Sequence, residues 1–386
     1  MEAKLIEDNN LRLIVYSSAG ELGEKVNKHL LKMYGYDKEK DTFIIPIKEN
    51  FFDDGHLKVE LKDTVRSKDV FMLTDIGNYS IEYMMHGFVN HTSPNDLMIQ
   101  LKDGIGACNR HAENINVVMP LLYAGRQHRR NTRENLMCGM NLRELDNMRS
   151  LRKFITFDAH DQGVEHALFD IEFDNFYASN EILKDFIEDL DVEQLKKLVF
   201  VAPDSGATGR RNVYLNSFQS DYIEREAGSF IKQRDYNHLV DGKYPVIAHE
   251  YCGNKNLDGY TAIVIDDMIS SGGSMFDVIE ELHRMNIKHI YIIVTYALFT
   301  KGIEQFQDYY DKGMFDGIYT TNLSYIPKEY MKSEWLHVCD CSKLVAQIIY
   351  YLHNDMSISG ILKDKSQPVK LIERKFRDAM KKKTNW

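Results

Sequence analysis

The stretch AIVIDDMISSGGSM, residues 262–275, joins four apolar residues to two aspartates and then to a loop of small residues. A helical pattern, FDVIEELHRM, begins at residue 276. An apolar strand that passes through a short loop into a helix is half of a βαβ unit, and such units build mostly parallel sheets. The small residues also leave the backbone N–H groups of a helix N-terminus accessible to an anion. The stretch therefore predicts an α/β fold with a ligand site at 266–274.

The same alternation of strand and helix patterns continues along the chain of 386 residues. Short apolar or β-branched runs predict buried strands, and amphipathic stretches such as ELGEKVNKHLLKM (21–33) predict helices between them. The predicted strands are LRLIVYSS (11–18), DVFMLTD (69–75), NINVVMPLL (114–122), FITFDAH (154–160), LVFVAPD (198–204), TAIVIDD (261–267) and HIYIIVTYALF (289–299). The length suits two domains at roughly 150 residues each, so we expect two α/β domains with mostly parallel sheets.

The composition argues against several functional classes. With 44% hydrophobic residues, 27% charged residues and a net charge of -10, the chain is too acidic for a general nucleic-acid binder. No apolar run approaches the roughly 18 residues that span a bilayer, and the N-terminus MEAKLIEDNN is too acidic for a secretory signal. The cysteines form no CxxC pair, which argues against a disulfide framework or a zinc site. We expect a cytoplasmic protein without nucleic-acid or membrane partners.

Acidic side chains follow or end several of the predicted strands. Asp158, Asp204, Asp266 and Asp267 all occupy such positions. In mostly parallel sheets, ligands bind at the carboxyl ends of the strands. We therefore expect these carboxylates to face a ligand.

Two regions lack the strand–helix alternation. The polar, glycine-containing region 205–258 predicts a long mobile loop or a β-hairpin, and loops of that length in compact domains are usually functional lids. The tail 363–386 is basic and amphipathic, which predicts a surface helix.

The loop at 266–274 combines a candidate phosphate site with a pair of carboxylates. It contains neither the GK[ST] of a P-loop nor a GxGxxG pattern. Carboxylates bind sugar hydroxyls, so phosphate at the helix N-terminus with a diol beside it describes a ribose 5-phosphate. The structural alternative is an ordinary strand–turn–helix junction with a capping serine.

VIDDMISSGGS resembles the ribose-5-phosphate loop of type I phosphoribosyltransferases and, more closely, that of ribose-phosphate pyrophosphokinases (PRPP synthetases). Further segments are similar to that family, in family order, over about residues 11 to 362. They are NFFDDGHLKVELKDTVRSKDVFML (50–73), SPND (93–96), VMPLLYAGRQHRR (118–130), TFDAHD (156–161), VAPDSGA (201–207), IKQRDYN (231–237) and CSKLVAQIIYYLHNDMSISGIL (341–362). The chain is identified on these motifs as a divergent member of this family.

The resemblance implies two similar phosphoribosyltransferase-like domains with the active site in the cleft between them. An N-terminal pyrophosphokinase domain would span 1–155 and hold the ATP clamp. A C-terminal phosphoribosyltransferase-like domain would span 156–335 and hold the ribose-5-phosphate loop. Residues 336–362 would pack back on the N-terminal domain, and the basic tail 363–386 lies outside the resemblance.

The implied reaction transfers the β,γ-pyrophosphoryl group of MgATP to the C1 hydroxyl of ribose 5-phosphate, giving PRPP and AMP. Such a transfer requires positioning and charge neutralisation more than covalent chemistry. The implied catalytic cations are Lys232 and Arg234, which would close over the transition state. The implied ligands of Mg²⁺ on the ATP phosphates are His160 and Asp204.

The remaining implied roles are substrate contacts. On the ATP side, Arg126 would bind phosphate, Gln127 would lie toward adenine, and Phe52, Asp54 and His56 would contact adenine from a neighbouring subunit. On the sugar side, Asp266 and Asp267 would bind the ribose hydroxyls, and Ser270, Ser271, Gly272, Gly273 and Ser274 would bind the 5-phosphate. The resemblance thus implies a homo-oligomer, either a dimer or a hexamer.

The chain departs from the family pattern at His56, His128 and Ser270, where Glu, Asp and Asp are usual. The first two changes affect the segments implied in adenine recognition and nucleotide-dependent regulation, and from His56 we expect altered nucleotide preference or a weaker ADP response. From Ser270 we expect weaker sugar binding. Two alternatives stay open: a regulatory paralogue without catalysis, which retention of Lys232 and Arg234 argues against, and a PRPP-consuming phosphoribosyltransferase, which would not need the segment 118–160.

Overall fold

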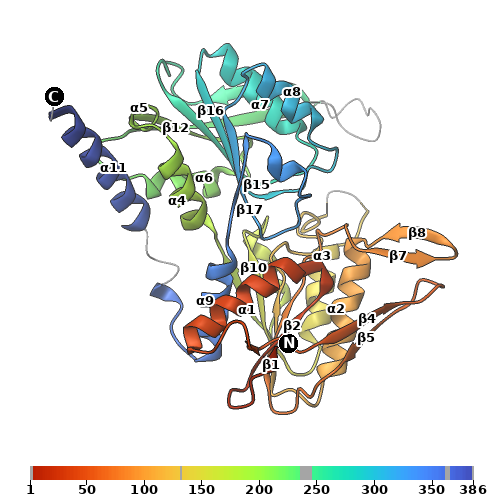
Figure 1. Ribbon diagram of the computed structural model, residues 1–386. Helices are drawn as coiled ribbons and strands as arrows, with labels where there is room; N and C mark the ends of the chain where they lie inside the picture. The colour runs from red at the N-terminus through yellow and green to blue at the C-terminus, as the bar shows by residue number, and fades with distance from the viewer. Residues whose placement is uncertain (1–2, 131–132, 235–245, 361–365, 385–386) are drawn as a thin grey trace. The chain divides into compact units, whose positions relative to one another are not determined.

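The computed structural model describes residues 3–130, 133–234, 246–360 and 366–384 (Figure 1). The chain divides into two compact units. Unit 1 comprises Met1–Ala178, Asn322–Ile326 and Asp340–Lys363, and unit 2 comprises Ser179–Thr321, Pro327–Cys339 and Asp364–Trp386. The predicted domain limits at residues 155, 335 and 362 stay predictions.

A five-stranded parallel sheet forms the centre of unit 1. Its order is β11-β10-β9-β6-β2, with β2 at Leu11–Val15, β6 at Asp69–Leu73, β9 at Asn114–Val118, β10 at Leu151–Phe157 and β11 at Glu172–Phe176. β6 is buried along its whole length, as strands covered on both faces require. The parallel order places the carboxyl ends of neighbouring strands at one edge.

Helices cover this sheet. They are α1 (Gly20–Tyr34), α2 (Pro94–Cys108), α3 (Met137–Asp146) and α9 (Ser342–His353), with 3₁₀ turns at Ser17–Ala19 and Gln162–Ala167. The predicted apolar stripe of α1 is buried at Leu22, Val26 and Leu30. α2 begins with a capping box between Ser93 and Asp96, which satisfies backbone donors at its first turn.

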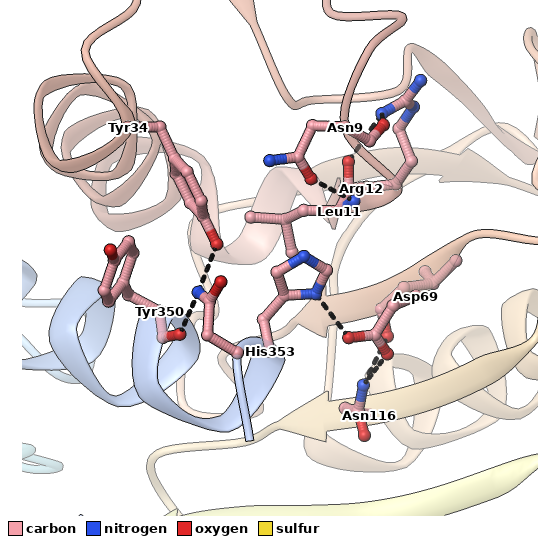
Figure 2. Close-up of polar contacts among 10 residues, drawn as sticks. Asn9, Leu11, Arg12, Tyr34, Asp69, Asn116, Tyr350 and His353 are labelled. Atoms are coloured by element: carbon pink, nitrogen blue, oxygen red, sulfur yellow. Dashed lines mark hydrogen bonds and ion pairs between the residues drawn. The ribbon is translucent and has the colours of Figure 1, made fainter. Parts of the chain in front are cut away.

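Polar contacts hold the C-terminal end of α9 against the rest of unit 1 (Figure 2). The His353 Nδ1 lies 2.7 Å from the Asp69 carboxylate, which also accepts a 2.8 Å hydrogen bond from the Asn116 amide. The Asn354 amide donates to the Tyr34 hydroxyl on α1 at 2.6 Å. These contacts join the helix to β6, β9 and α1.

Besides α9, the segment Asn322–Ile326 also belongs to unit 1, and it contacts Asp75, which follows β6. Its buried carboxylate accepts hydrogen bonds from the Ser324 hydroxyl at 2.9 Å and the Tyr325 N–H at 2.7 Å. Burial raises the pKa of Asp75 to about 6, and its hydrogen bonds oppose that shift. This carboxylate therefore holds the segment Asn322–Ile326 in unit 1.

Two antiparallel hairpins extend from unit 1 and lie side by side (Figure 1). One joins β4 (Ile47–Phe51) to β5 (Leu57–Leu61), and the other joins β7 (Glu82–Met85) to β8 (Phe88–His91). A short parallel pair, β1 (Lys4–Leu5) with β3 (Asp41–Thr42), completes the unit's strands in the described residues.

Unit 2 contains a seven-stranded sheet in the order β14-β13-β12-β15-β16-β17-β18. The strands are β12 (Lys197–Ala202), β13 (Glu224–Arg234), β14 (Val246–Cys252), β15 (Thr261–Ile269), β16 (His289–Ala297), β17 (Gly317–Thr321) and β18 (Leu336–Cys339). Every pairing is parallel except β13 with β14. The predicted α/β class with mostly parallel sheets is confirmed.

The helices of unit 2 include one that the sequence did not predict. They are α4 (Ser179–Asp189), α5 (Val192–Leu195), α6 (Thr208–Ser217), α7 (Gly273–Arg284), α8 (Glu304–Asp311) and α11 (Ser366–Thr384), with a 3₁₀ turn at Tyr330–Lys332. The expectation of irregular structure across 205–258 was wrong at α6. The expected β-hairpin is present as β13 and β14, while residues 235–245 of the expected mobile loop lie outside the described residues.

The predicted tail helix is confirmed, but it is more than a surface element. Ile372 and Phe376 of α11 are buried in the core cluster of unit 2, together with Phe186 and Ile187 of α4. The helix thus supplies apolar side chains that the unit would otherwise lack.

Within the part of the chain that the structure describes, no helix combines the length and apolar character needed to cross a membrane.

Candidate active site

The carboxyl edge of the unit 1 sheet carries the candidate ATP clamp and His160. Arg126 and Gln127 follow β9, are exposed, and lie in a turn in which the Gln127 N–H donates to the Ala124 carbonyl at 2.8 Å. His160 follows the neighbouring strand β10 and is also exposed. Because β9 and β10 are paired in parallel, their following segments emerge at the same edge.

His128 connects these two segments. Its ring centroid lies 5.4 Å from that of His160, and its Nε2 lies 3.3 Å from an Asp161 carboxylate oxygen. The side chain is only 11% exposed. His128, one of the three departures from the family pattern, therefore packs between the ATP clamp and the candidate metal ligand. Arg126, Gln127 and His160 thus lie in one region of unit 1.

The candidate adenine contacts lie elsewhere in unit 1, on the turn between β4 and β5. Phe52 is 48% exposed, and Asp54 and His56 are exposed beside it. The His56 Nδ1 lies 3.1 Å from Asp54 Oδ2. Among the described residues, no hydrogen bond, ion pair or ring contact joins this turn to Arg126. An outward-facing turn of this kind is suited to contact a second molecule.

The carboxyl edge of the unit 2 sheet gathers three carboxylates. β12 pairs with β15 as far as Val264, and β15 then continues through Asp266 and Asp267. The Asp267 N–H donates to Asp266 Oδ1 at 2.9 Å. Asp204 follows β12, and its side chain accepts from two N–H groups at the start of α6.

Burial and neighbouring charged groups determine the electrostatics of Asp266. Burial first, and then the carboxylates of Asp267 and Asp204, raise the pKa of Asp266 well above its usual range. Arg210 opposes this shift, with its Nη1 3.8 Å from Asp266 Oδ1. The carboxylates of Asp204 and Asp267 both act on Asp266, so a cation or hydroxyl donors would be bound favourably here.

The loop after β15 has the conformation of an open helix N-terminus. Gly272 adopts φ 85° and is the N-cap of α7, so the capping position itself carries no side chain. A Cβ at Gly272 would lie 2.7 Å from the Phe306 ring, so this position requires glycine for both conformation and space. Ser271, Gly273 and Ser274 are exposed, and Ser270 is half-buried. The N-cap is thus Gly272 and not the serine that the structural alternative expected, whereas an ordinary strand–turn–helix junction stays an alternative.

The candidate catalytic cations lie on β13, so this part of region 205–258 has the β-hairpin form of the prediction and not the loop form. Lys232 pairs with His249 and Arg234 pairs with Val246 in the antiparallel β13–β14 ladder. Backbone hydrogen bonds along this ladder support the extended conformation as far as Arg234. Their side chains lie outside the described residues.

Arg210 is a residue of this edge that the sequence analysis missed. It is the third residue of α6, its side chain is 11% exposed, and its guanidinium approaches the Asp266 carboxylate. The available signal was the pair Arg210–Arg211 a few residues after a strand-end aspartate in an acidic chain.

Known proteins are similar to this chain over nearly its full length. The model of the N-terminal domain of ribose phosphate pyrophosphokinase matches residues 11–148, and the phosphoribosyl transferase domain model matches residues 173–326. The ribose-phosphate pyrophosphokinase of Synechocystis sp. is 24% identical over 365 residues, covering 94% of this chain and 96% of the relative. The ribose-phosphate pyrophosphokinase of Mycoplasmopsis pulmonis is 24% identical over 339 residues, covering 87% of this chain and 94% of the relative.

A solved structure has the same fold. The phosphoribosylpyrophosphate synthetase from Mycobacterium smegmatis superposes with a TM-score of 0.70 and 18% identity, covering 90% of this chain and 100% of that chain.

Proposed function

Because the chain belongs to the ribose-phosphate pyrophosphokinase family, we propose that it transfers the β,γ-pyrophosphoryl group of MgATP to the C1 hydroxyl of ribose 5-phosphate. The observation that carries this proposal is the edge of unit 2, where Asp266 and Asp267 precede an open helix N-terminus. That arrangement suits a sugar diol and a phosphate on one ligand.

In the proposed reaction the C1 oxygen attacks the β-phosphorus of ATP. The bond between that phosphorus and the oxygen bridging to the α-phosphorus breaks, AMP leaves with the electron pair, and the hydroxyl proton is released. Asp266 and Asp267 hold the ribose hydroxyls, and residues 270–274 hold the 5-phosphate. Lys232 and Arg234 neutralise charge on the transferred group, while Arg126 and Gln127 hold ATP.

We also propose that Mg²⁺ on the ATP phosphates supplies charge neutralisation, with His160 and Asp204 as its protein ligands. Among the residues that the structure describes, no group of three or more His, Cys, Asp and Glu side chains is arranged to hold a metal ion. Mg²⁺ usually keeps several waters and binds substrate phosphates with one or two protein groups, so two protein ligands would suffice.

The test of this proposal is phosphorus NMR of a mixture of the protein, MgATP and ribose 5-phosphate. We expect AMP and a pyrophosphoryl group on C1, formed only when the sugar is present and lost when EDTA removes the metal. A folded sample that binds ATP but forms no sugar-dependent AMP would support the regulatory paralogue instead.

A second expected result concerns the ribose carboxylates. Asp267→Asn should raise the KM for ribose 5-phosphate by roughly ten- to a hundredfold, because a hydrogen bond to a charged group contributes about 1.5–3 kcal/mol. The Tm should stay close to that of the wild type, and the control Asp258→Asn, at an exposed position of the same unit, should change neither value. A protein that unfolds readily with its sugar affinity intact would assign Asp267 a structural role.

We further propose a cytoplasmic homo-oligomer, either a dimer or a hexamer. The exposed turn Phe52–His56 supports this, since it is free to reach the adenine site of a neighbouring copy.

A further inference from the structure

The β7–β8 hairpin supports the turn that carries the candidate adenine contacts (Figure 1). The Tyr83 ring stacks on the Phe51 ring, with centroids 4.5 Å apart and an interplanar angle of 21°. The His86 N–H donates a 2.8 Å hydrogen bond to the Asp53 carbonyl. The tips of the two hairpins are thus joined by both side-chain and backbone contacts.

A third contact lies at the centre of the turn. The Met85 sulfur packs so closely on Gly55 that a Cβ added there would lie 2.7 Å from it, and Gly55 adopts φ 88°. Tyr83 and Met85 are half-buried, whereas the intervening Met84 is 48% exposed. Because side chains alternate along a strand, Tyr83 and Met85 lie on one face of β7, and that face packs on the end of the β4–β5 hairpin.

The internal contacts of the turn join residues 52–56 only to one another, and Asp54 accepts from the His56 N–H at 3.1 Å. The Phe52 N–H donates to the His56 carbonyl, and the Gly55 N–H donates to the Phe52 carbonyl, both at 2.8 Å. An isolated two-stranded hairpin is marginally stable in water, so the position of its tip depends on what packs against it. Here the second hairpin provides that packing.

We propose that the β7–β8 hairpin is a positioning element that fixes the Phe52–His56 turn and thereby sets the affinity and base preference of the enzyme for ATP. This inference rests on the proposed function, in which that turn contacts adenine. Tyr83 and Met85 act through Phe51 and Gly55 and do not themselves touch the nucleotide. A turn that is already ordered loses less conformational freedom when it binds, which strengthens binding without a new contact.

The first test compares Tyr83→Ala with Tyr83→Phe. Loss of the ring pair should weaken MgATP binding, measured by calorimetry, about three- to tenfold and raise the KM for ATP by the same factor. The ratio of ATP to GTP affinity should fall as well, while kcat and the KM for ribose 5-phosphate stay constant. Tyr83→Phe keeps the ring and should restore wild-type values. The matched control is Met84→Ala, on the same strand but facing away from the turn.

A second variant removes the support altogether. The Thr92 N–H and the Ile81 carbonyl are 2.9 Å apart at the base of the hairpin, so an Asn-Gly turn can replace residues 82–91. We expect an ATP-affinity loss at least as large as that of Tyr83→Ala, with kcat retained at saturating ATP.

Unchanged ATP affinity in both variants would overturn the proposal, as would an equal loss in Met84→Ala. The binding measurement also separates this inference from the reaction itself. If the wild type forms no PRPP yet Tyr83→Ala weakens ATP binding selectively, the proposed reaction fails and the positioning role stands.

Discussion

Replacing Lys232 or Arg234 by alanine is expected to lower kcat about a hundredfold while the Kd for ATP changes little. Negative charge builds on the transferred group and on the departing AMP oxygen as the reaction proceeds, so these cations act mainly in the transition state. Removing one donor that stabilises such charge typically costs about 3 kcal/mol, which corresponds to the stated loss of rate. Steady-state kinetics and calorimetric titration with ATP provide the two values.

The strand position of this pair favours that expectation. Residues on a hydrogen-bonded ladder are held more precisely than residues in a free loop, and β13 extends as far as Arg234. The control is Lys255→Ala, which removes an exposed cation beyond the hairpin and should leave both values unchanged. If the alanine variants lose ATP affinity and keep kcat at saturation, the two cations belong to ground-state recognition.

The sheets were predictable because their central strands are buried on both faces. β12 and β15 appear in the sequence as nearly continuous apolar runs. Such a run indicates a buried strand without knowledge of the elements that pack against it. The aspartates at their carboxyl ends were predictable for the same reason. The glycine at 272 was predictable as part of a small-residue loop, whereas its role as the cap of α7 required the backbone conformation.

Elements whose side chains are mostly polar were not predictable. Only Tyr214 and Ser217 of α6 are buried, so its sequence has no clear apolar stripe and was interpreted as irregular. Arg210 was missed with it, because its importance depends on the 3.8 Å approach to Asp266 and not on any local pattern. The support of one hairpin tip by another likewise depends on tertiary contacts.

The packing of the tail helix was also not predictable from the sequence. Its amphipathic pattern predicts a helix but does not identify the element that the helix packs against. Ile372 is fully buried in the core cluster of unit 2, and Phe376 is 6% exposed. The Lys375 ammonium donates to the carbonyls of Ile187 and Glu188 at 2.8 and 2.7 Å. It therefore satisfies carbonyls at the C-terminal end of α4, which have no partner within that helix.

We therefore expect Ile372→Ala to lower the free energy of unfolding by about 2–5 kcal/mol, because it removes fully buried methyl groups and leaves a cavity. Ile372→Val should cost about 0.5–1.5 kcal/mol. The matched control on the same helix is Arg374→Ala, whose 3.2 Å ion pair with Glu188 is exposed on both sides and should contribute no more than about 1 kcal/mol. Urea denaturation followed by circular dichroism gives all three values.

Truncation before residue 364 extends this test to the whole helix. It removes both buried side chains and the Lys375 contacts at once, and it exposes the apolar residues of α4 that they cover. The shortened chain should unfold at a lower urea midpoint than Ile372→Ala and should bind ribose 5-phosphate only under conditions in which unit 2 remains folded. A truncated protein as stable as the wild type would show that α11 is a surface helix, because a side chain that contributes to the core cannot be removed without loss of stability.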